Sequence, residues 1–252
     1  WDRFTFTLDD NIVQRAYKSF NKMWDDGLIY RGERIVNFCT THGTGFSDYE
    51  VEYKDEKSKL WTIAFPLADG SDLIEIATTR PETMIGDVAV AVNPNDERYK
   101  RFVGKEVALP LTDRRIPILA DEMVDPEFGT GAVKITPAHD PNDFELVERH
   151  NLPRINVIGF DGKMTENAPE KYRGMEVLDA RKAILDDLSD LELLTDETDY
   201  EHSVGHCYKC GTRIQPLLKE QWFLRVKPLA ERAKQAVEAG EIDFYPATKA
   251  KV

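Results

Sequence analysis

A lysine and two aspartates stand close together within residues 129–144, and side chains of these types could bind a cationic or hydroxylated ligand. The segment opens with a Gly-Thr-Gly turn and continues with a short run of alternating apolar and polar residues, which is typical of a strand. Lys134 and Thr136 share one face of that strand. A proline ends it. Asp140, followed by another proline, predicts the start of a helix, because proline suits the first helical position. We therefore expect Asp140 and Asp143 at a helix start, beside the end of a strand that carries Lys134.

Both aspartates also fit a purely structural role. Asp140 suits the N-cap of the expected helix, and Asp143 falls at the position of a capping-box acid. An N-cap carboxylate keeps a free lone pair, so capping and ligand binding are compatible. The spacing by itself favours neither interpretation, and a second motif is needed to decide.

A second group of hydroxyl and charged side chains occupies residues 77–87, directly after an expected strand at 73–76. Its Thr-Thr-Arg-Pro-Glu-Thr-Met sequence, together with Lys-Ile-Thr-Pro-Ala-His-Asp-Pro-Asn-Asp-Phe at 134–144, resembles the editing domain of class I aminoacyl-tRNA synthetases, most of all the valyl members. Leucyl members share His-Asp-x-x-Asp-Phe, but they usually carry aspartate for Glu82 and an apolar residue for Lys134. The resemblance runs over almost the whole chain.

The resemblance implies post-transfer editing, in which the ester of threonine on tRNA(Val) is hydrolysed at the 3′ end of the tRNA. Threonine and valine have nearly the same size, so the site must bind the hydroxyl group to separate them. We expect Asp143 to bind the substrate ammonium group and Asp140 to accept the threonine hydroxyl, while Arg80 or Lys134 could meet phosphates. The expected catalytic residues are Asp143, Lys134 and Thr79, and the expected substrate-binding residues are Arg80, Thr83, Thr136, Asp140 and Asp143.

The sequence offers no evident nucleophile–base pair, so the hydrolysis is expected to use a positioned water molecule and no catalytic metal. The adenylating signatures of the synthetase family are absent, so no amino-acid activation is expected. Both ends are expected to continue into the rest of a synthetase chain. Two alternatives stay open: a leucyl-type editing domain and a non-catalytic tRNA-binding module.

Two pairs of residues have the spacing of metal-binding knuckles: Cys39-x-x-His42 and Cys207-x-x-Cys210, each followed by glycine. Three thiolates and one imidazole would form a closed, tetrahedral zinc site with a structural role. The alternative is two ordinary β-turns with reduced cysteines. Valyl members that carry this site have cysteine at the position of His42, and imidazole can replace it as a ligand.

The composition is that of a globular protein, with 41% hydrophobic and 31% charged residues. The net charge of −13 argues against a broad nucleic-acid-binding face, so the tRNA contact is expected to be local, with the 3′ end inserted into a pocket. No apolar run reaches the length of a membrane span, and no signal peptide opens the chain. Together with only three cysteines, these features predict a cytoplasmic protein without a membrane partner.

The predicted fold class is α+β: a β-barrel-like editing domain with a closed or nearly closed sheet, peripheral helices and a small zinc-knuckle appendage. Three parts are expected: residues 1–50 with a helix and the first knuckle, 51–200 with the body of the domain, and 201–252 with the second knuckle, a strand and a returning helix. Helices are predicted at 11–26, 177–188 and 228–239, and strands at 34–38, 47–53, 60–67, 88–92, 107–111, 116–120, 155–160 and 221–224. The acidic segment 192–200 shows no pattern.

Overall fold

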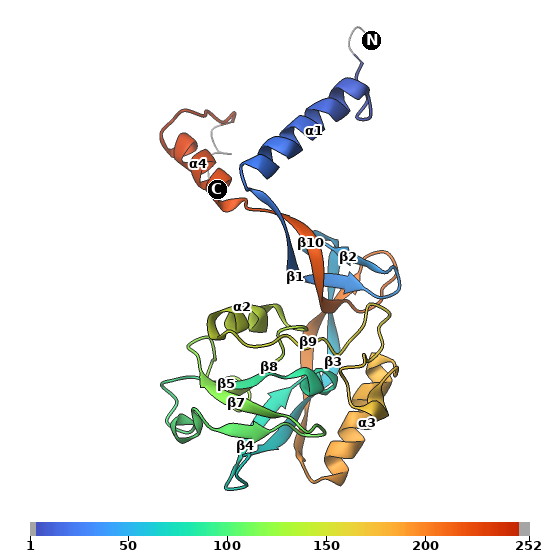
Figure 1. Ribbon diagram of the computed structural model, residues 1–252, viewed down its shortest axis with the longest axis vertical. Helices are drawn as coiled ribbons and strands as arrows, with labels where there is room; N and C mark the ends of the chain where they lie inside the picture. The colour runs from blue at the N-terminus through green and yellow to red at the C-terminus, as the bar shows by residue number, and fades with distance from the viewer. Residues whose placement is uncertain (1–3, 247–252) are drawn as a thin grey trace. The chain divides into compact units, whose positions relative to one another are not determined.

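The computed structural model describes residues 4–246, and the chain divides into two compact units. The central unit spans residues 34–219, and the terminal unit combines the residues before and after it. Figure 1 shows that helices and strands are mixed along the chain. Within residues 4–246, no helix combines the length and the apolar character that crossing a membrane requires. The three-part division expected from the sequence stays a prediction.

The terminal unit contains two helices at the predicted places. Helix α1 spans Asp10–Asp25 and α4 spans Lys227–Glu238. Gly27 follows α1 with a φ of 69°, a backbone conformation that favours glycine after a helix. Trp222 packs edge-on against aromatic rings of α1, with 5.9 Å and 5.6 Å between ring centroids. Neither helix contains a buried residue, so the hydrophobic core of the chain belongs to the central unit.

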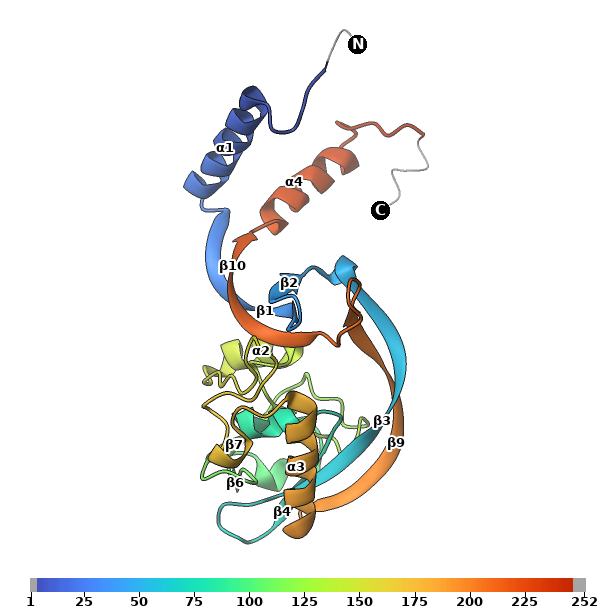
Figure 2. The same ribbon diagram turned by 90° about the vertical axis from the view of Figure 1, so that its right-hand side faces the viewer.

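Two long antiparallel strands dominate the central unit. Strand β3 (Val51–Pro66) pairs with β9 (Leu194–Cys207), and β4 (Leu73–Thr78) pairs with the other edge of β3. The β3–β9 pairing runs from Val51 opposite Cys207 to Ile63 opposite Leu194. Figure 2 shows the two strands curving side by side over their length. This sheet therefore joins residues that are more than a hundred positions apart in the sequence.

A second sheet carries the strand with Lys134. Its order is β6-β7-β5-β8, with β6 at Glu106–Ala108, β7 at Arg115–Ala120, β5 at Ala89–Val92 and β8 at Ala132–Ile135. Strand β8 runs antiparallel to β5, with Lys134 opposite Val90. Before β8, Gly131 has a φ of 82°, and a Cβ atom there would lie 2.8 Å from the carbonyl oxygen of Pro126. The turn that starts β8 thus requires glycine.

The remaining elements complete the frame. A third sheet has the order β10-β1-β2, with β10 at Gln215–Leu224, β1 at Ile29–Cys39 and β2 at Thr44–Phe46. The helices of the central unit are α2 (Pro141–His150) and α3 (Val177–Asp190), and the 3₁₀ turns are η1 (Asp48–Glu50), η2 (Pro81–Gly86), η3 (Lys100–Phe102) and η4 (Glu170–Tyr172).

Two buried clusters hold these elements together. The larger one joins the first two sheets to α3 and includes Met84 and Ile85 of η2. The smaller one packs Leu146 and Val147 of α2 against β5 and against Ile135 of β8. The end of β8 and the start of α2 are therefore fixed to one another, as the sequence predicts.

The described residues form three sheets and no closed barrel, so the barrel-like arrangement expected from the sequence is not confirmed. One isolated bridge, Leu67 opposite Val107, joins the first sheet to the second. At another junction the side chain of Thr130 donates to the carbonyl oxygen of Glu75, where a closed sheet would need a backbone ladder.

Three strand predictions also need correction. Segments 47–53 and 60–67 were expected as two strands, but β3 is a single strand from Val51, because its polar middle pairs with β9. The acidic segment 192–200 without a pattern belongs to β9. Residues 155–160 form only an isolated bridge, Ile158 opposite Met164, because the carbonyl oxygen of Asn156 accepts from two side chains.

Candidate functional site

A cavity of about 170 Å³ lies where β3, β4, η2, β8 and α2 meet. Its lining contains all seven residues that the sequence assigns to catalysis or substrate binding. The complete lining is Leu60, Ala77, Thr78, Thr79, Arg80, Thr83, Phe128, Val133, Lys134, Thr136, His139, Asp140 and Asp143. Two motifs that are about fifty residues apart in the sequence are thus brought to one site.

The two aspartates of α2 differ in their surroundings. Asp140 is the N-cap, and its Oδ1 accepts from the backbone N–H of Asn142 at 2.9 Å. Asp143 does not complete a capping box: its Oδ2 accepts from the backbone N–H of Thr136 at 2.7 Å. Asp143 is buried, and burial followed by the charge of Asp140 raises its pKa to about 7. The site therefore holds a carboxyl group that a cationic ligand can ionise near neutral pH.

Lys134 and Thr136 meet a third acid that the sequence left without a role. The Nζ of Lys134 lies 3.2 Å from Oδ1 of Asp87, and it also donates to the hydroxyl of Thr136. The hydroxyl of Thr136 donates to the same Oδ1. Asp87 is completely buried, and this burial raises its pKa to about 6 although Lys134 and Thr136 oppose the rise.

Arg80 is held by hydrogen bonds on several sides. It donates to the carbonyl oxygen of His139 at 2.9 Å and to Oε1 of Gln215 at 2.8 Å. Its backbone N–H donates to the hydroxyl of Thr78 at 3.1 Å, while the hydroxyl of Thr83 donates to its carbonyl oxygen at 2.9 Å. The geometry thus separates the neighbouring threonines: Thr78 and Thr83 hold the turn, while Thr79 lines the cavity.

His139 has a structural environment. The backbone N–H of Val157 donates to its Nε2 at 2.9 Å, so the proton lies on Nδ1, which faces the carbonyl oxygen of Pro216 at 3.4 Å. Burial, followed by the charge of Arg80, lowers its pKa to about 3. The imidazole is therefore neutral, and its lone pair is already occupied, so it is not available as a general base.

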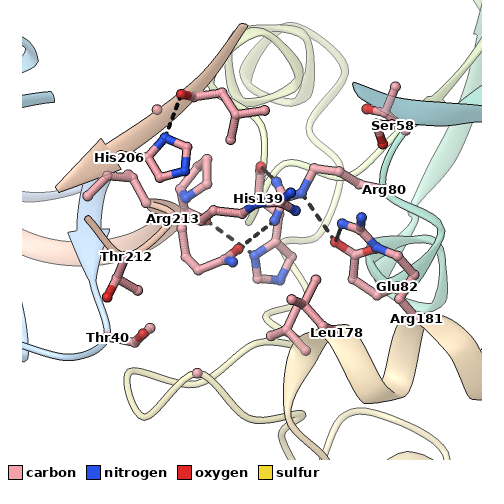
Figure 3. Close-up of a pocket in the computed structure, with 18 of the residues that line it drawn as sticks. Thr40, Ser58, Arg80, Glu82, His139, Leu178, Arg181, His206, Thr212 and Arg213 are labelled. Carbon is pink, nitrogen blue, oxygen red and sulfur yellow. Dashed lines mark hydrogen bonds and ion pairs between the residues drawn. The ribbon is translucent and has the colours of Figure 1, made fainter. Parts of the chain in front are cut away.

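A larger cavity of about 690 Å³ adjoins the first one and shares Thr79, Arg80, His139 and Asp140 with it. Figure 3 shows Arg80, Glu82 and Arg181 grouped at its wall. Glu82 is buried and accepts two hydrogen bonds from Arg181, at 2.7 and 2.8 Å. Burial opposes the ionisation of Glu82, but Arg181 outweighs it, and the pKa of Glu82 lies below its ordinary value.

The four predicted metal ligands come together, with their ligand atoms all within 4.8 Å of one another. The Sγ of Cys39 lies 3.6 Å from that of Cys210 and 3.4 Å from Nδ1 of His42, and the Sγ of Cys207 lies 3.6 Å from the same nitrogen. A tetrahedral zinc site with ordinary ligand distances has about 3.8 Å between sulfurs and about 3.6 Å between sulfur and nitrogen. This donor set fits a four-coordinate metal ion.

Sequence reasoning missed part of the lining, namely Leu60, Phe128 and Val133, and it gave no role to Asp87 or Arg181. None of the residues described as lining the smaller cavity is a serine or cysteine. The side chains present can bind an ammonium group, donate from a lysine and orient water. They suit the hydrolysis of an activated ester better than covalent catalysis.

Comparisons with known proteins agree on one family. The family model for "tRNA synthetases class I (I, L, M and V)" matches residues 1–252. The valine–tRNA ligase of Thermotoga maritima is 52% identical over 252 residues, which are 100% of this chain and 29% of that protein. The valine–tRNA ligase of Carboxydothermus hydrogenoformans is 53% identical over 246 residues, 98% of this chain and 28% of that protein. The chain thus spans less than a third of the length of these relatives.

Proposed function

This chain belongs to the class I tRNA synthetases (I, L, M and V), and we propose that it is an editing unit that hydrolyses the ester of threonine on tRNA(Val). The observation that carries the proposal is the gathering of Thr79, Arg80, Thr83, Lys134, Thr136, Asp140 and Asp143 around one cavity of about 170 Å³. A cavity of this size suits one amino-acid side chain with its ammonium group.

Asp143 binds the ammonium group in this proposal. Its carboxyl group is buried and has a pKa of about 7, so a positive ligand stabilises its ionised form. Asp140 stands beside it and contributes a second negative charge. The hydrogen bond from the backbone of Thr136 holds Asp143 in place at the end of β8.

The side-chain hydroxyl of the substrate distinguishes threonine from valine. Asp140 accepts one hydrogen bond as a cap, and its carboxylate retains lone pairs for the threonine hydroxyl. Valine would place a methyl group against a polar partner and leave it unpaired, at a cost of about 1–3 kcal/mol. Rejection of valine therefore follows from hydrogen bonding, since the sizes are nearly equal.

Hydrolysis uses a water molecule that the cavity orients. An aminoacyl ester is already activated, so positioning and electrostatic stabilisation of the developing oxyanion are sufficient. Lys134 supplies a positive charge in the lining, and Thr79 supplies a hydroxyl group. His139 takes no part in proton transfer, because both of its nitrogens have backbone partners. No amino-acid activation is expected from these residues.

The knuckle residues are proposed to hold structural zinc. Cys39, His42, Cys207 and Cys210 would bind it, and a bound zinc ion supplies folding energy. The hydroxyl and the backbone N–H of Thr212 lower the pKa of Cys210 to about 6, which favours the thiolate that binds metal. The ion would connect the loop after β1 to the end of β9, and the hydrolysis does not need it.

A deacylation assay tests the function. The chain is incubated with tRNA(Val) charged with threonine or valine and with tRNA(Leu) charged with leucine. Release of threonine well above release of valine and leucine supports the proposal. Preferential release of leucine would identify a leucyl-type editing domain, and binding without release would identify a tRNA-binding module. The remainder of the synthetase chain, the proposed partner, is added in a parallel reaction to supply further tRNA contacts.

A further inference from the structure

Asp87 is a completely buried acid that lies behind the cavity and does not line it. It follows η2 directly, and its Oδ1 meets both the ammonium group of Lys134 and the hydroxyl of Thr136. Its other oxygen, Oδ2, is buried without a hydrogen-bond partner in the described part of the chain. Burying a carboxylate oxygen without a hydrogen-bond partner lowers the stability of the folded state, so the presence of this acid needs an explanation.

We propose that Asp87 is a positioning residue that sets the hydrogen-bonding polarity of the cavity wall, so that Lys134 presents an N–H donor and Thr136 presents a lone pair to the substrate hydroxyl. The inference rests on the proposed function for the identity of that ligand. Asp87 acts through its two neighbours and does not touch the substrate itself.

The direction of each hydrogen bond follows from the chemistry of the groups. An ionised carboxylate can only accept hydrogen bonds, so the Thr136 hydroxyl must be the donor in its hydrogen bond to Asp87. Its oxygen then faces its other neighbours as an acceptor, and Lys134 donates to it. An ammonium group has three N–H donors. Two of those of Lys134 point to Asp87 and Thr136, which leaves the third for a ligand in the cavity.

This polarity favours threonine over valine. The threonine hydroxyl can accept from the free N–H of Lys134 and can donate to an oxygen of the lining. A valine methyl group would leave that N–H unpaired in a buried site. The selectivity proposed for Asp140 on one side of the cavity is thus supported by a second polar partner that Asp87 keeps in place.

The backbone of Asp87 is fixed from the opposite side. Arg114 donates to the carbonyl oxygen of Asp87 at 2.8 Å and to that of Ile85 at 2.5 Å. These two bonds hold the end of η2 against the turn that precedes β7. The carboxylate therefore has a defined position before any substrate arrives, as preorganised sites require.

A double-mutant cycle tests the proposal through deacylation of Thr-tRNA(Val). Asp87→Asn keeps the shape but gives the amide a donor where an acceptor is required. We expect kcat/KM to fall about 10- to 100-fold, the range of one hydrogen bond to a charged group. With Val-tRNA(Val) the fall should be smaller. In a chain that already carries Lys134→Met and Thr136→Val, Asp87→Asn should cause no further loss. An equal loss in both backgrounds would overturn the proposal, as would no loss at all.

A ligand-free measurement separates this proposal from the proposed function. Lysine-selective ¹⁵N NMR detects slowly exchanging ammonium groups, and Lys134→Met identifies the signal of Lys134. Asp87→Asn should shift or broaden that signal. The control is Asp187→Asn, which removes an acid of α3 that is bonded to Lys171 and Tyr172 of η4, and it should leave the signal unchanged. If the unaltered chain fails to deacylate Thr-tRNA(Val), the function is wrong, while an unchanged Lys134 signal in Asp87→Asn refutes the positioning role. Thermal unfolding of each variant verifies that it is folded.

Discussion

Arg181 holds Glu82 through two parallel hydrogen bonds, with its Nε 2.7 Å from Oε2 and its Nη2 2.8 Å from Oε1. The contact joins α3 to the Thr-Thr-Arg-Pro-Glu-Thr motif, and Arg80 lies 3.5 Å from the same carboxylate. A paired guanidinium and carboxylate fix orientation as well as charge. Helix α3 therefore helps to place a residue of the candidate site, although it contributes no residue to the smaller cavity.

Removing Arg181 should destabilise the chain strongly. Arg181→Ala removes both hydrogen bonds of the guanidinium group and leaves the buried Glu82 with Arg80, 3.5 Å away, as its remaining cation. Losing one partner of a buried pair costs about 3–5 kcal/mol. Arg181→Lys should destabilise the chain less, because it keeps the positive charge, although it loses the two parallel hydrogen bonds. Urea unfolding gives both free energies. Lys182→Ala, at the exposed neighbouring position, is the control and should change the free energy of unfolding by less than about 0.5 kcal/mol.

Asp143 should make the folded state less stable as the pH rises. Its pKa is raised in the folded chain from 3.8 to about 7, so the folded state binds a proton that the unfolded state has released between these values. This contribution to stability is present below about pH 4 and is lost as the pH rises through about 7. Asp143→Asn removes the effect, so its free energy of unfolding should fall less between pH 5 and pH 8.

Chemical unfolding at pH 5 and pH 8 decides this prediction, with Asp187→Asn as the control. Asp87 also has a raised pKa and remains in the variant, so part of the pH dependence should persist. Asp143→Asn should also abolish deacylation, because an amide cannot neutralise the substrate ammonium group. An identical pH dependence in both chains would show that Asp143 keeps an ordinary pKa.

Asp140 should affect stability and specificity separately. Asp140→Ala removes the N-cap oxygen that accepts from the backbone N–H of Asn142, which should lower the free energy of unfolding by about 0.5–2 kcal/mol with or without substrate. It should also reduce kcat/KM for Thr-tRNA(Val) more than for residual cleavage of Val-tRNA(Val). Asp140→Asn keeps an oxygen that can cap the helix, so its loss of stability should be smaller. If both variants lose the deacylation of Thr-tRNA(Val) and of Val-tRNA(Val) in equal proportion, Asp140 only supports the turn and does not recognise the threonine hydroxyl.

Elemental analysis of the purified chain should find about one zinc ion per chain. Cys207→Ser should lower the metal content and the melting temperature together, because structural zinc contributes to folding. His42→Cys should retain the metal, since four thiolates also form a tetrahedral site. A metal-free chain with an unchanged melting temperature would refute zinc binding at these residues.

The sequence predicts the local parts of the candidate site well. The strand with Lys134 and the helix start at Asp140 depend on neighbouring glycine and proline residues, which act over a few positions. The role of Asp87 depends on the register of β8 and β5, which sets Lys134 opposite Val90. No local pattern encodes that register, so the contact could not be predicted.

The long strands show the same limit. The middle of β3, with Lys54, Lys57 and Lys59, has none of the apolar alternation from which a strand is recognised. It is a strand because β9 supplies hydrogen bonds along its whole length. Likewise, the ligand spacing of the knuckles is visible in the sequence, but the approach of Cys39 to Cys210 depends on the complete fold.

The pairing of β3 with β9 also has a consequence for synthesis on the ribosome. More than a hundred residues separate the two strands, so one edge of β3 has no partner until the intervening residues and β9 have been translated. Contacts this distant in sequence form slowly, and an exposed strand edge invites pairing with another nascent chain. The charged side chains in the middle of β3, lysines among them, disfavour such pairing because it would bring them out of water. The same residues that hide the strand from sequence reasoning thus protect the growing polypeptide from aggregation until Cys207 has emerged.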